Sequence, residues 1–309
     1  TNAWTSFEET VYTEDVPSNV ISKYLALQSE RFRNPILRIF HTELEAVYEE
    51  KNRGLDSDGR KAFEAMFATL FPNNNYGKQT TIGTIEHLKN PSLLEIRKYF
   101  NTYYVPNNMG IIMSGDFNPD EVIKEIDKYF GGMKNKPEKN ITSPIVKDVV
   151  GPEPEYIMMG YRLPGASHKD AQILELVGKV LTNGTAGMID LNLVQSQKLL
   201  GAYAFPYMLK DYSMLLLQGM PAEGQSLDEV RTLILAELAK LKKGEFSESL
   251  LTAIINNEKK AIIEKDESYG SRASELQNYF STELDWKQRV DYTATLSKIT
   301  KKQSSIGFV

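Results

Sequence analysis

Apolar residues recur every three or four positions over much of the chain, and shorter segments are continuously apolar or alternate with polar residues. The first pattern indicates helices with one buried face, and the second indicates β-strands. In the first half, we expect strands within residues 4–14 and over 108–115. Helices are expected from Ser18 through Phe32, from Pro35 through residue 52, from Asn90 to about Tyr104, and from Asn118 through Phe130.

The same two patterns continue in the second half, beyond a segment rich in proline and lysine at residues 134–155. This segment is the best candidate for a domain boundary, and we predict an α+β fold with domains over 1–145 and 146–309. In the second domain, we expect strands over 156–163, 202–209 and 212–220, and helices over 171–181, 188–200, 226–242 and 246–264.

A weak internal repeat relates the two halves. "VYTEDVP" precedes a helix pair whose second member ends in "AVYEEK", and "LLLQGMP" precedes a pair whose second member ends in "IINNEKK". This similarity predicts two copies of one α+β unit. In the alignment Glu50 corresponds to Glu258, whereas Glu43 corresponds to Leu251. Chemistry that needs both acids would therefore belong to the first copy.

Composition narrows the classes of function. The net charge is −5, which argues against a nucleic-acid surface because phosphate binding favours a basic face. No apolar run approaches the roughly 20 residues that a transmembrane helix needs, so we expect no membrane span. The chain has no cysteine, which excludes disulfides, thiolate ligands and a cysteine nucleophile. A chain without cysteine suits the cytosol and the periplasm equally.

Two acids in "ELEAVYEEKN" are candidates for chemistry. Glu43 and Glu50 are seven residues apart, which places both carboxylates on one face of a helix. Such a pair could hold a metal or share a proton, but a solvated helix face is an alternative interpretation. His41 and Glu45 could also share a metal by their spacing, although a half-exposed helix histidine is the commoner arrangement.

Four segments resemble one known family. They are "TNAWTSFEETVYTEDVP", "FRNPILRIFHTELEAVYEEKN", "YGKQTTIGTIEHLKN" and "YFNTYYVPNNMGIIMSGDFNPDEVIKEIDKYFGG", in this order. The family is that of the insulinase/pitrilysin zinc metallopeptidases, which include the mitochondrial processing peptidases. In the same order, the four segments are similar to its Asn-Ala strand pair, its Glu-x6-Glu helix, its Gly-Thr loop and its Tyr-Tyr to Tyr-Phe-Gly succession. The resemblance implies two related domains, each a mostly antiparallel sheet with helices on one side, forming half of a clam-shell.

The resemblance also implies roles for four residues. Glu50 matches the family's third zinc ligand, and Glu43 matches the acidic residue that supports the active site. Asn2 and Ala3 match the edge strand along which a peptide substrate adds as an extra strand.

One part of the family pattern is missing from residues 1–309. The family binds zinc through two histidines of a His-x-x-Glu-His helix, whose glutamate is the general base and which normally precedes the Asn-Ala strand. His41, His87 and His168 do not form this pattern. The second copy also has "QSQKLLGAYAF" where peptide-gripping repeats carry an arginine. We therefore expect a fragment that binds no zinc and is inactive alone, although its parent uses zinc.

The resemblance implies that the parent is a zinc endopeptidase acting on extended peptides. Its partners would be a peptide and the second half of the clam-shell, from the same chain or another subunit. We expect a bacterial protein of the periplasm or cell envelope. One alternative is a non-catalytic family member that serves as a structural or peptide-binding partner. Another is an unrelated α+β ligand-binding protein, which would lack a repeated sheet-and-helix unit.

Overall fold

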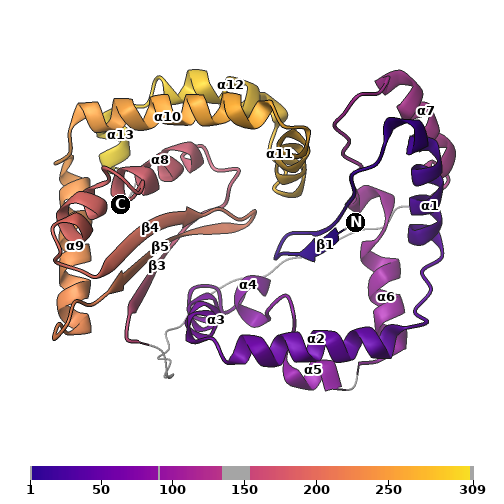
Figure 1. Cartoon of the computed structure of the whole chain (residues 1–309), viewed down its shortest axis with the longest axis horizontal. Coiled ribbons are helices and arrows are strands. Elements are labelled where there is room, and N and C mark those ends of the chain that lie inside the picture. The colour runs from indigo at the N-terminus through magenta and orange to yellow at the C-terminus, as the bar shows by residue number, and fades with distance from the viewer. Residues whose placement is uncertain (1, 90, 134–153, 307–309) are drawn as a thin grey trace. The chain divides into compact units, whose positions relative to one another are not determined.

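The chain folds into two compact units, Thr1–Ile145 and Val146–Val309, in a computed structural model (Figure 1). The structure describes residues 2–89, 91–133 and 154–306. Both units combine antiparallel strands with several helices, so the chain belongs to the predicted α+β class. Most of the predicted boundary segment lies outside the described residues, as does Asn90.

Unit 1 begins with a strand pair and continues as helices. The strands β1 and β2 are antiparallel, with Asn2 opposite Thr13 and Thr5 opposite Thr10. The elements are β1 (Asn2–Thr5), β2 (Thr10–Thr13), a 3₁₀ turn (Ser18–Val20), α1 (Ile21–Arg33), α2 (Phe40–Leu55), α3 (Asp58–Leu70), α4 (Asn75–Lys78), α5 (Ile85–Lys89), α6 (Leu93–Tyr103), a second 3₁₀ turn (Pro106–Asn108) and α7 (Pro119–Phe130).

Two predictions for unit 1 need correction. The predicted strand over 108–115 is wrong: this segment leaves the 3₁₀ turn in an irregular path, and Ile111 is 43% exposed. A strand needs a neighbour for its backbone groups, and β1 and β2, the two strands among the described residues of this unit, pair with each other. The helix expected from Pro35 begins at Phe40 instead.

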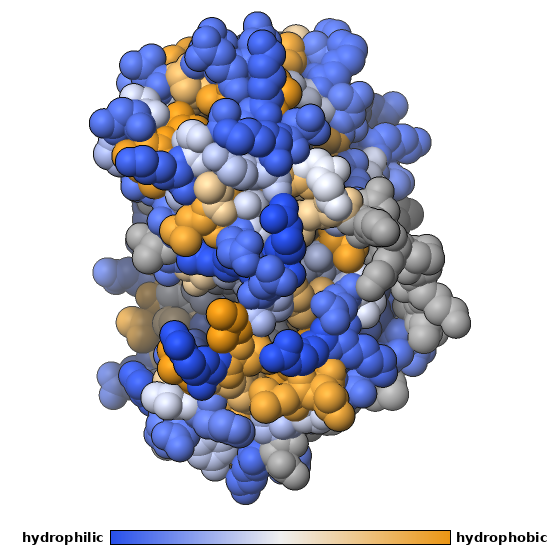
Figure 2. Space-filling view, turned by 90° about the vertical axis from the view of Figure 1, so that its right-hand side faces the viewer, coloured by the Kyte–Doolittle hydropathy of each residue, from blue (hydrophilic) through white to orange (hydrophobic). Residues whose placement is uncertain are grey.

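Several large apolar side chains of unit 1 are exposed. Leu27, Ile36, Ile39, Leu94 and Ile123 are each more than half exposed. Figure 2 views the side that carries α1, α6 and α7, and it shows apolar atoms gathered at the height of α6 and α2 in Figure 1. Exposed apolar clusters of this kind mark contact faces in soluble proteins.

Unit 2 is built on a three-stranded antiparallel sheet in the order β3-β5-β4. The central strand β5 is buried over most of its length. The elements are β3 (Ile157–Pro164), α8 (Ala171–Leu181), a π-helical turn (Asp190–Gln195), β4 (Gly201–Tyr207), β5 (Tyr212–Met220), α9 (Leu227–Lys243), α10 (Glu248–Asp266), α11 (Tyr269–Ser281), α12 (Trp286–Leu296) and α13 (Lys301–Ile306).

One extensive apolar core holds unit 2 together. Leu215 and Leu217 of β5 pack in one buried cluster with Val177 and Val180 of α8 and with residues of α9 and α10. Gly178 permits the close approach of α8 to β4, because a Cβ atom at this position would lie 2.3 Å from Pro206 Cδ. The missing side chain therefore sets the distance between helix and sheet.

The two units share an order of elements that agrees with the sequence repeat. In unit 1 the pair β1–β2 leads into α1 and α2, and in unit 2 the pair β4–β5 leads into α9 and α10. Glu50 of α2 and Glu258 of α10 therefore occupy corresponding helices. No helix among the described residues is long and apolar enough to cross a membrane.

Candidate functional site

The helix α2 presents Glu43 and Glu50 to solvent. Phe40, Leu44 and Val47 form its half-buried side, which explains why this segment packs as a helix even though no side chain caps its N-terminus. Both carboxylates are exposed, and the two-turn separation corresponds to about 10 Å along the axis. Glu43 lies in the first turn, where the helix dipole favours a negative charge.

Neither carboxylate is engaged with a neighbouring side chain. Among the described residues, Glu43 and Glu50 make no side-chain hydrogen bond or ion pair. The adjacent Lys51 behaves differently: it is 6% exposed, and its Nζ lies 3.4 Å from Oε1 of Glu64 in α3. Nε of Arg60 also lies 3.6 Å from Oε1 of Glu64, so that Glu64 forms a second ion pair. Lys51 therefore holds α2 against α3, and the two carboxylates remain available for a ligand.

The described residues do not by themselves form a metal site. No group of three or more His, Cys, Asp or Glu side chains within them is placed to hold a metal ion, whereas a zinc hydrolase needs three protein ligands. The three histidines have local contacts. His41 packs edge-on against Phe40 at 5.7 Å, His87 Nδ1 accepts a hydrogen bond from Thr84 N–H at 3.3 Å, and His168 Nδ1 accepts one from Asp170 N–H at 3.3 Å.

Asn2 and Ala3 lie on β1, whose four residues are all exposed. One edge of β1 pairs with β2, and no other strand among the described residues pairs with its second edge, which could therefore accept another strand. The Ala3 N–H donates to Oδ1 of Asn2 at 2.9 Å, so the Asn2 side chain satisfies one backbone donor of this strand. Opposite Ala3, burial and a hydrogen bond with Tyr104 raise the pKa of Tyr12.

An aromatic cluster fixes the turn between β1 and β2. Phe7 stacks on Phe67 of α3 at 4.8 Å and meets Tyr76 of α4 edge-on at 5.5 Å. The Tyr76 hydroxyl donates a hydrogen bond to Oε1 of the neighbouring Glu8. Sequence reasoning missed these residues, although the spacing of Phe63, Phe67 and Phe71 marks one face of a helix. The cluster attaches the β1 edge to the helical part of unit 1.

Comparison with known proteins identifies the family. Residues 92–258, more than half of the chain, match the family model described as the peptidase M16 inactive domain. The chain belongs to the M16 peptidase family. This is the family that the resemblance in the sequence indicated, and the M16 match spans parts of both units. Glu43, Glu50, Asn2 and Ala3 lie outside the matched range.

Similar proteins include named zinc proteases. The M16 chain is 29% identical over 295 residues to the zinc protease PqqE of Helicobacter pylori, an alignment that covers 90% of this chain and 66% of PqqE. A crystal structure of a protease from Helicobacter pylori has a TM-score of 0.87 and 27% identity, covering 98% of this chain and 77% of that one.

A solved structure of lower sequence identity supports the assignment of the fold, and only of the fold. The first half of the periplasmic protease PqqL from Escherichia coli is 19% identical, with a TM-score of 0.70 over 98% of this chain and 71% of that one. The α+β fold predicted from the sequence is therefore confirmed by both the elements and the solved M16 structures. These comparisons do not assign a role to any single side chain of α2 or β1.

Proposed function

We propose that this chain is part of a zinc-dependent endopeptidase that hydrolyses peptide bonds in extended peptides. The observation that carries the proposal is the pair of exposed carboxylates without side-chain partners, Glu43 and Glu50, two turns apart on α2 of an M16 family member. The zinc proteases among its relatives support a hydrolytic parent enzyme.

In this proposal Glu50 is one ligand of the zinc ion, and Glu43 supports the site electrostatically. Zinc bound in such a site acidifies a water molecule to a pKa near 7, which makes a nucleophile at neutral pH. The described residues do not complete a zinc site. In the proposal, the other ligands and the general base are supplied by another part of the parent enzyme or by a partner subunit. The chain alone is then inactive and holds no zinc.

The proposed substrate binds as an added strand at the open edge of β1. Main-chain hydrogen bonds give affinity in this mode without requiring a particular side chain. Asn2 and Ala3 contribute the edge, and the contact of Phe7 with Phe67 and Tyr76 keeps it in place. An extended or unfolded peptide suits this edge because a folded protein has its strands already paired.

The proposed partner is the second half of an M16 clam-shell, from the same chain or from another subunit. The exposed apolar surface of unit 1 supports this proposal, as does the description of the PqqL fragment as a first half. We further propose a location in the periplasm or cell envelope of a bacterium, which is supported by the periplasmic location of PqqL and the bacterial source of PqqE.

A non-catalytic role in peptide binding or assembly is the second candidate. It is favoured by the matching family model, which describes an inactive domain. The two exposed carboxylates of α2 favour the catalytic role instead. A gene that encodes His-x-x-Glu-His before the Thr1 position would support the peptidase, and a gene without it would support the non-catalytic role.

Two activity measurements test the proposal. The 309-residue chain should not cleave a fluorogenic peptide, and chelator-sensitive cleavage would contradict its inactivity alone. In the parent enzyme, Glu50→Gln should abolish cleavage and bound zinc, and Glu43→Gln should reduce cleavage. Glu49→Gln is the matched control, since Glu49 is a neighbouring exposed acid on α2. Equal effects of Glu49→Gln and Glu50→Gln would refute the assignment.

A further inference from the structure

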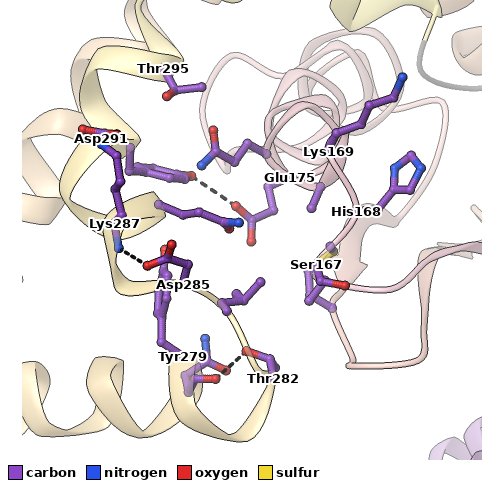
Figure 3. Close-up of a pocket in the computed structure, with 18 residues that line it drawn as sticks. Ser167, His168, Lys169, Glu175, Tyr279, Thr282, Asp285, Lys287, Asp291 and Thr295 are labelled. Atoms are coloured by element: carbon purple, nitrogen blue, oxygen red, sulfur yellow. Dashed lines mark hydrogen bonds and ion pairs between the residues drawn. The ribbon is translucent and has the colours of Figure 1, made fainter.

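Unit 2 contains a pocket of about 410 Å³ between the start of α8 and the helices α11 and α12. Its size lies within the roughly 300–1,000 Å³ range of small-molecule sites. Figure 3 shows the Glu175 carboxylate in the middle of this pocket, directed from α8 toward α12. The pocket belongs to unit 2 alone, so it is separate from the proposed peptidase residues on α2 and β1.

Glu175 has a hydrogen bond but no ion pair among the described residues. The Tyr292 hydroxyl of α12 donates to Oε2 of Glu175 at 3.1 Å. Shielding from water raises the pKa of Glu175, while the Tyr292 hydrogen bond and Lys179 act to lower it. Lys179 is itself paired with Glu258 of α10. The Glu175 carboxylate therefore lacks a cation of its own.

The other charged groups around the pocket have partners or point elsewhere. Lys287 Nζ lies 2.5 Å from Oδ2 of Asp291. Oδ1 of Asp285 accepts a hydrogen bond from the Lys287 N–H at 2.9 Å and caps α12. Figure 3 shows Lys169 and His168 pointing away from the Glu175 carboxylate. Glu175 is thus the carboxylate that a bound cation would meet inside the pocket.

We propose that this pocket binds an organic cation, a guanidinium or primary ammonium group, with Glu175 as its counter-ion. The aromatic side chains of Tyr279 and Tyr292 line the same pocket, and aromatic faces attract such cations. A guanidinium also presents several N–H donors to a carboxylate. The cation comes either from the basic side chain of a peptide or from a free small amine, since both present the same group.

Binding of model compounds to the 309-residue chain tests this proposal without an activity readout. Isothermal titration at pH 8 should show binding of N-acetyl-arginine methylamide and at least tenfold weaker binding of N-acetyl-citrulline methylamide, its uncharged analogue. Methylguanidinium and the tripeptide Gly-Arg-Gly distinguish the sources. Tighter binding of the tripeptide indicates a peptide side chain, and equal or tighter binding of methylguanidinium indicates a free cation.

Two variants locate the binding. Glu175→Gln keeps the shape of the side chain and should weaken binding of the arginine compound at least tenfold. Asp291→Asn removes a charge from the same pocket, but that charge is already paired with Lys287, so its effect should stay below about twofold. Equal affinity for the arginine and citrulline compounds, or unchanged affinity in folded Glu175→Gln, overturns the proposal. The comparison of compounds uses the unaltered chain and does not depend on either variant folding.

Discussion

Glu258 of α10 forms an ion pair with Lys179 of α8, whereas Glu50, its counterpart in α2, has no side-chain partner among the described residues. The position thus has a structural contact in unit 2 and an exposed, unpaired carboxylate in unit 1. The partly exposed ion pair supports the packing of α10 on α8, and Leu251, the counterpart of Glu43, is buried in the core. In unit 2, the residues at both corresponding positions therefore contribute to packing.

This difference predicts unequal effects on stability. Glu258→Gln should lower the free energy of unfolding by up to about 1 kcal/mol, the range measured for partly exposed ion pairs. Glu50→Gln should change it by less than about 0.5 kcal/mol, as for an isolated surface residue. Urea denaturation of the 309-residue chain measures both. A loss with Glu50→Gln as large as that with Glu258→Gln would show that Glu50 has a structural role.

Glu175 predicts a dependence of stability on pH. Its pKa is raised in the folded protein, chiefly by burial, so the folded state holds this proton more tightly than the unfolded state does. Stability is therefore lost as the pH rises from the ordinary value of 4.5 through the raised pKa. Glu175→Gln should increase stability above that window by about 1 kcal/mol, because it removes a shielded negative charge that has no ion-pair partner.

Thermal unfolding at pH 4 and pH 8 checks this expectation. The difference between Glu175→Gln and the unaltered chain should be small at pH 4 and clear at pH 8. Lys179, Glu258 and Lys265 also act on Glu175, and Asp291→Asn serves as the control for a general change in charge. A gain that is equal at both pH values would contradict the assignment to Glu175.

The aromatic cluster predicts that Phe67 is essential to unit 1. Phe67→Ala removes a side chain that is 2% exposed and should cost about 3–5 kcal/mol. Hydrogen exchange should show faster exchange of the β1–β2 amides, because Phe7 then loses its stacking partner. Phe280→Ala is the control, since Phe280 is 52% exposed and should cost less than about 1 kcal/mol.

The close contact at Gly178 predicts that adding a single methyl group at this position destabilises the protein. Gly178→Ala would place Cβ against the Pro206 ring, 2.3 Å from Cδ, and overpacking of this kind costs about 1–3 kcal/mol. Gly132→Ala is the matched control, because a Cβ atom there meets nothing within 4 Å. Chemical denaturation should show a lower midpoint for Gly178→Ala alone. A neutral Gly178→Ala would mean that α8 moves away from β4 at little cost.

Zinc addition tests whether the carboxylates of α2 form a site on their own. Two carboxylates bind zinc weakly and with little selectivity, so excess zinc should leave the melting temperature of the 309-residue chain unchanged within about one degree. Differential scanning calorimetry with zinc and with magnesium measures this. A stabilisation of several degrees that disappears in Glu50→Ala would contradict the expectation.

Local sequence signals predicted the helices better than the strands of unit 1. Asn118 and Pro119 start α7 as expected, with Asn118 Oδ1 accepting a hydrogen bond from Asp120 N–H at 3.0 Å. Helix α6 begins at Leu93 with Ser92 as its cap, a short distance from the expected start at Asn90. The apolar run over 108–115 led to a wrong strand prediction, because pairing depends on a neighbour that the run itself does not specify.

The candidate site could be predicted only in part. The spacing of Glu43 and Glu50 was sufficient to place both on one helix, because the geometry of a helix is local. The contact of Phe7 with Phe67 and Tyr76 joins distant segments, and the position of Glu175 opposite Tyr292 does the same. Periodicity cannot report which distant segments meet, so neither arrangement could be read from the chain.

The ends of α9 have a consequence for folding. Ser226 and Glu229 form a capping box at its start, and Gly244 ends it in the left-handed conformation, with φ of 71°. Both signals involve residues close in sequence, whereas β3 must find β5 across more than 40 intervening residues. Local contacts form faster than distant ones. Helix α9 is therefore suited to form early in folding. Its residues Val230 and Ile234 would then provide an apolar surface against which the strands of unit 2 can pack.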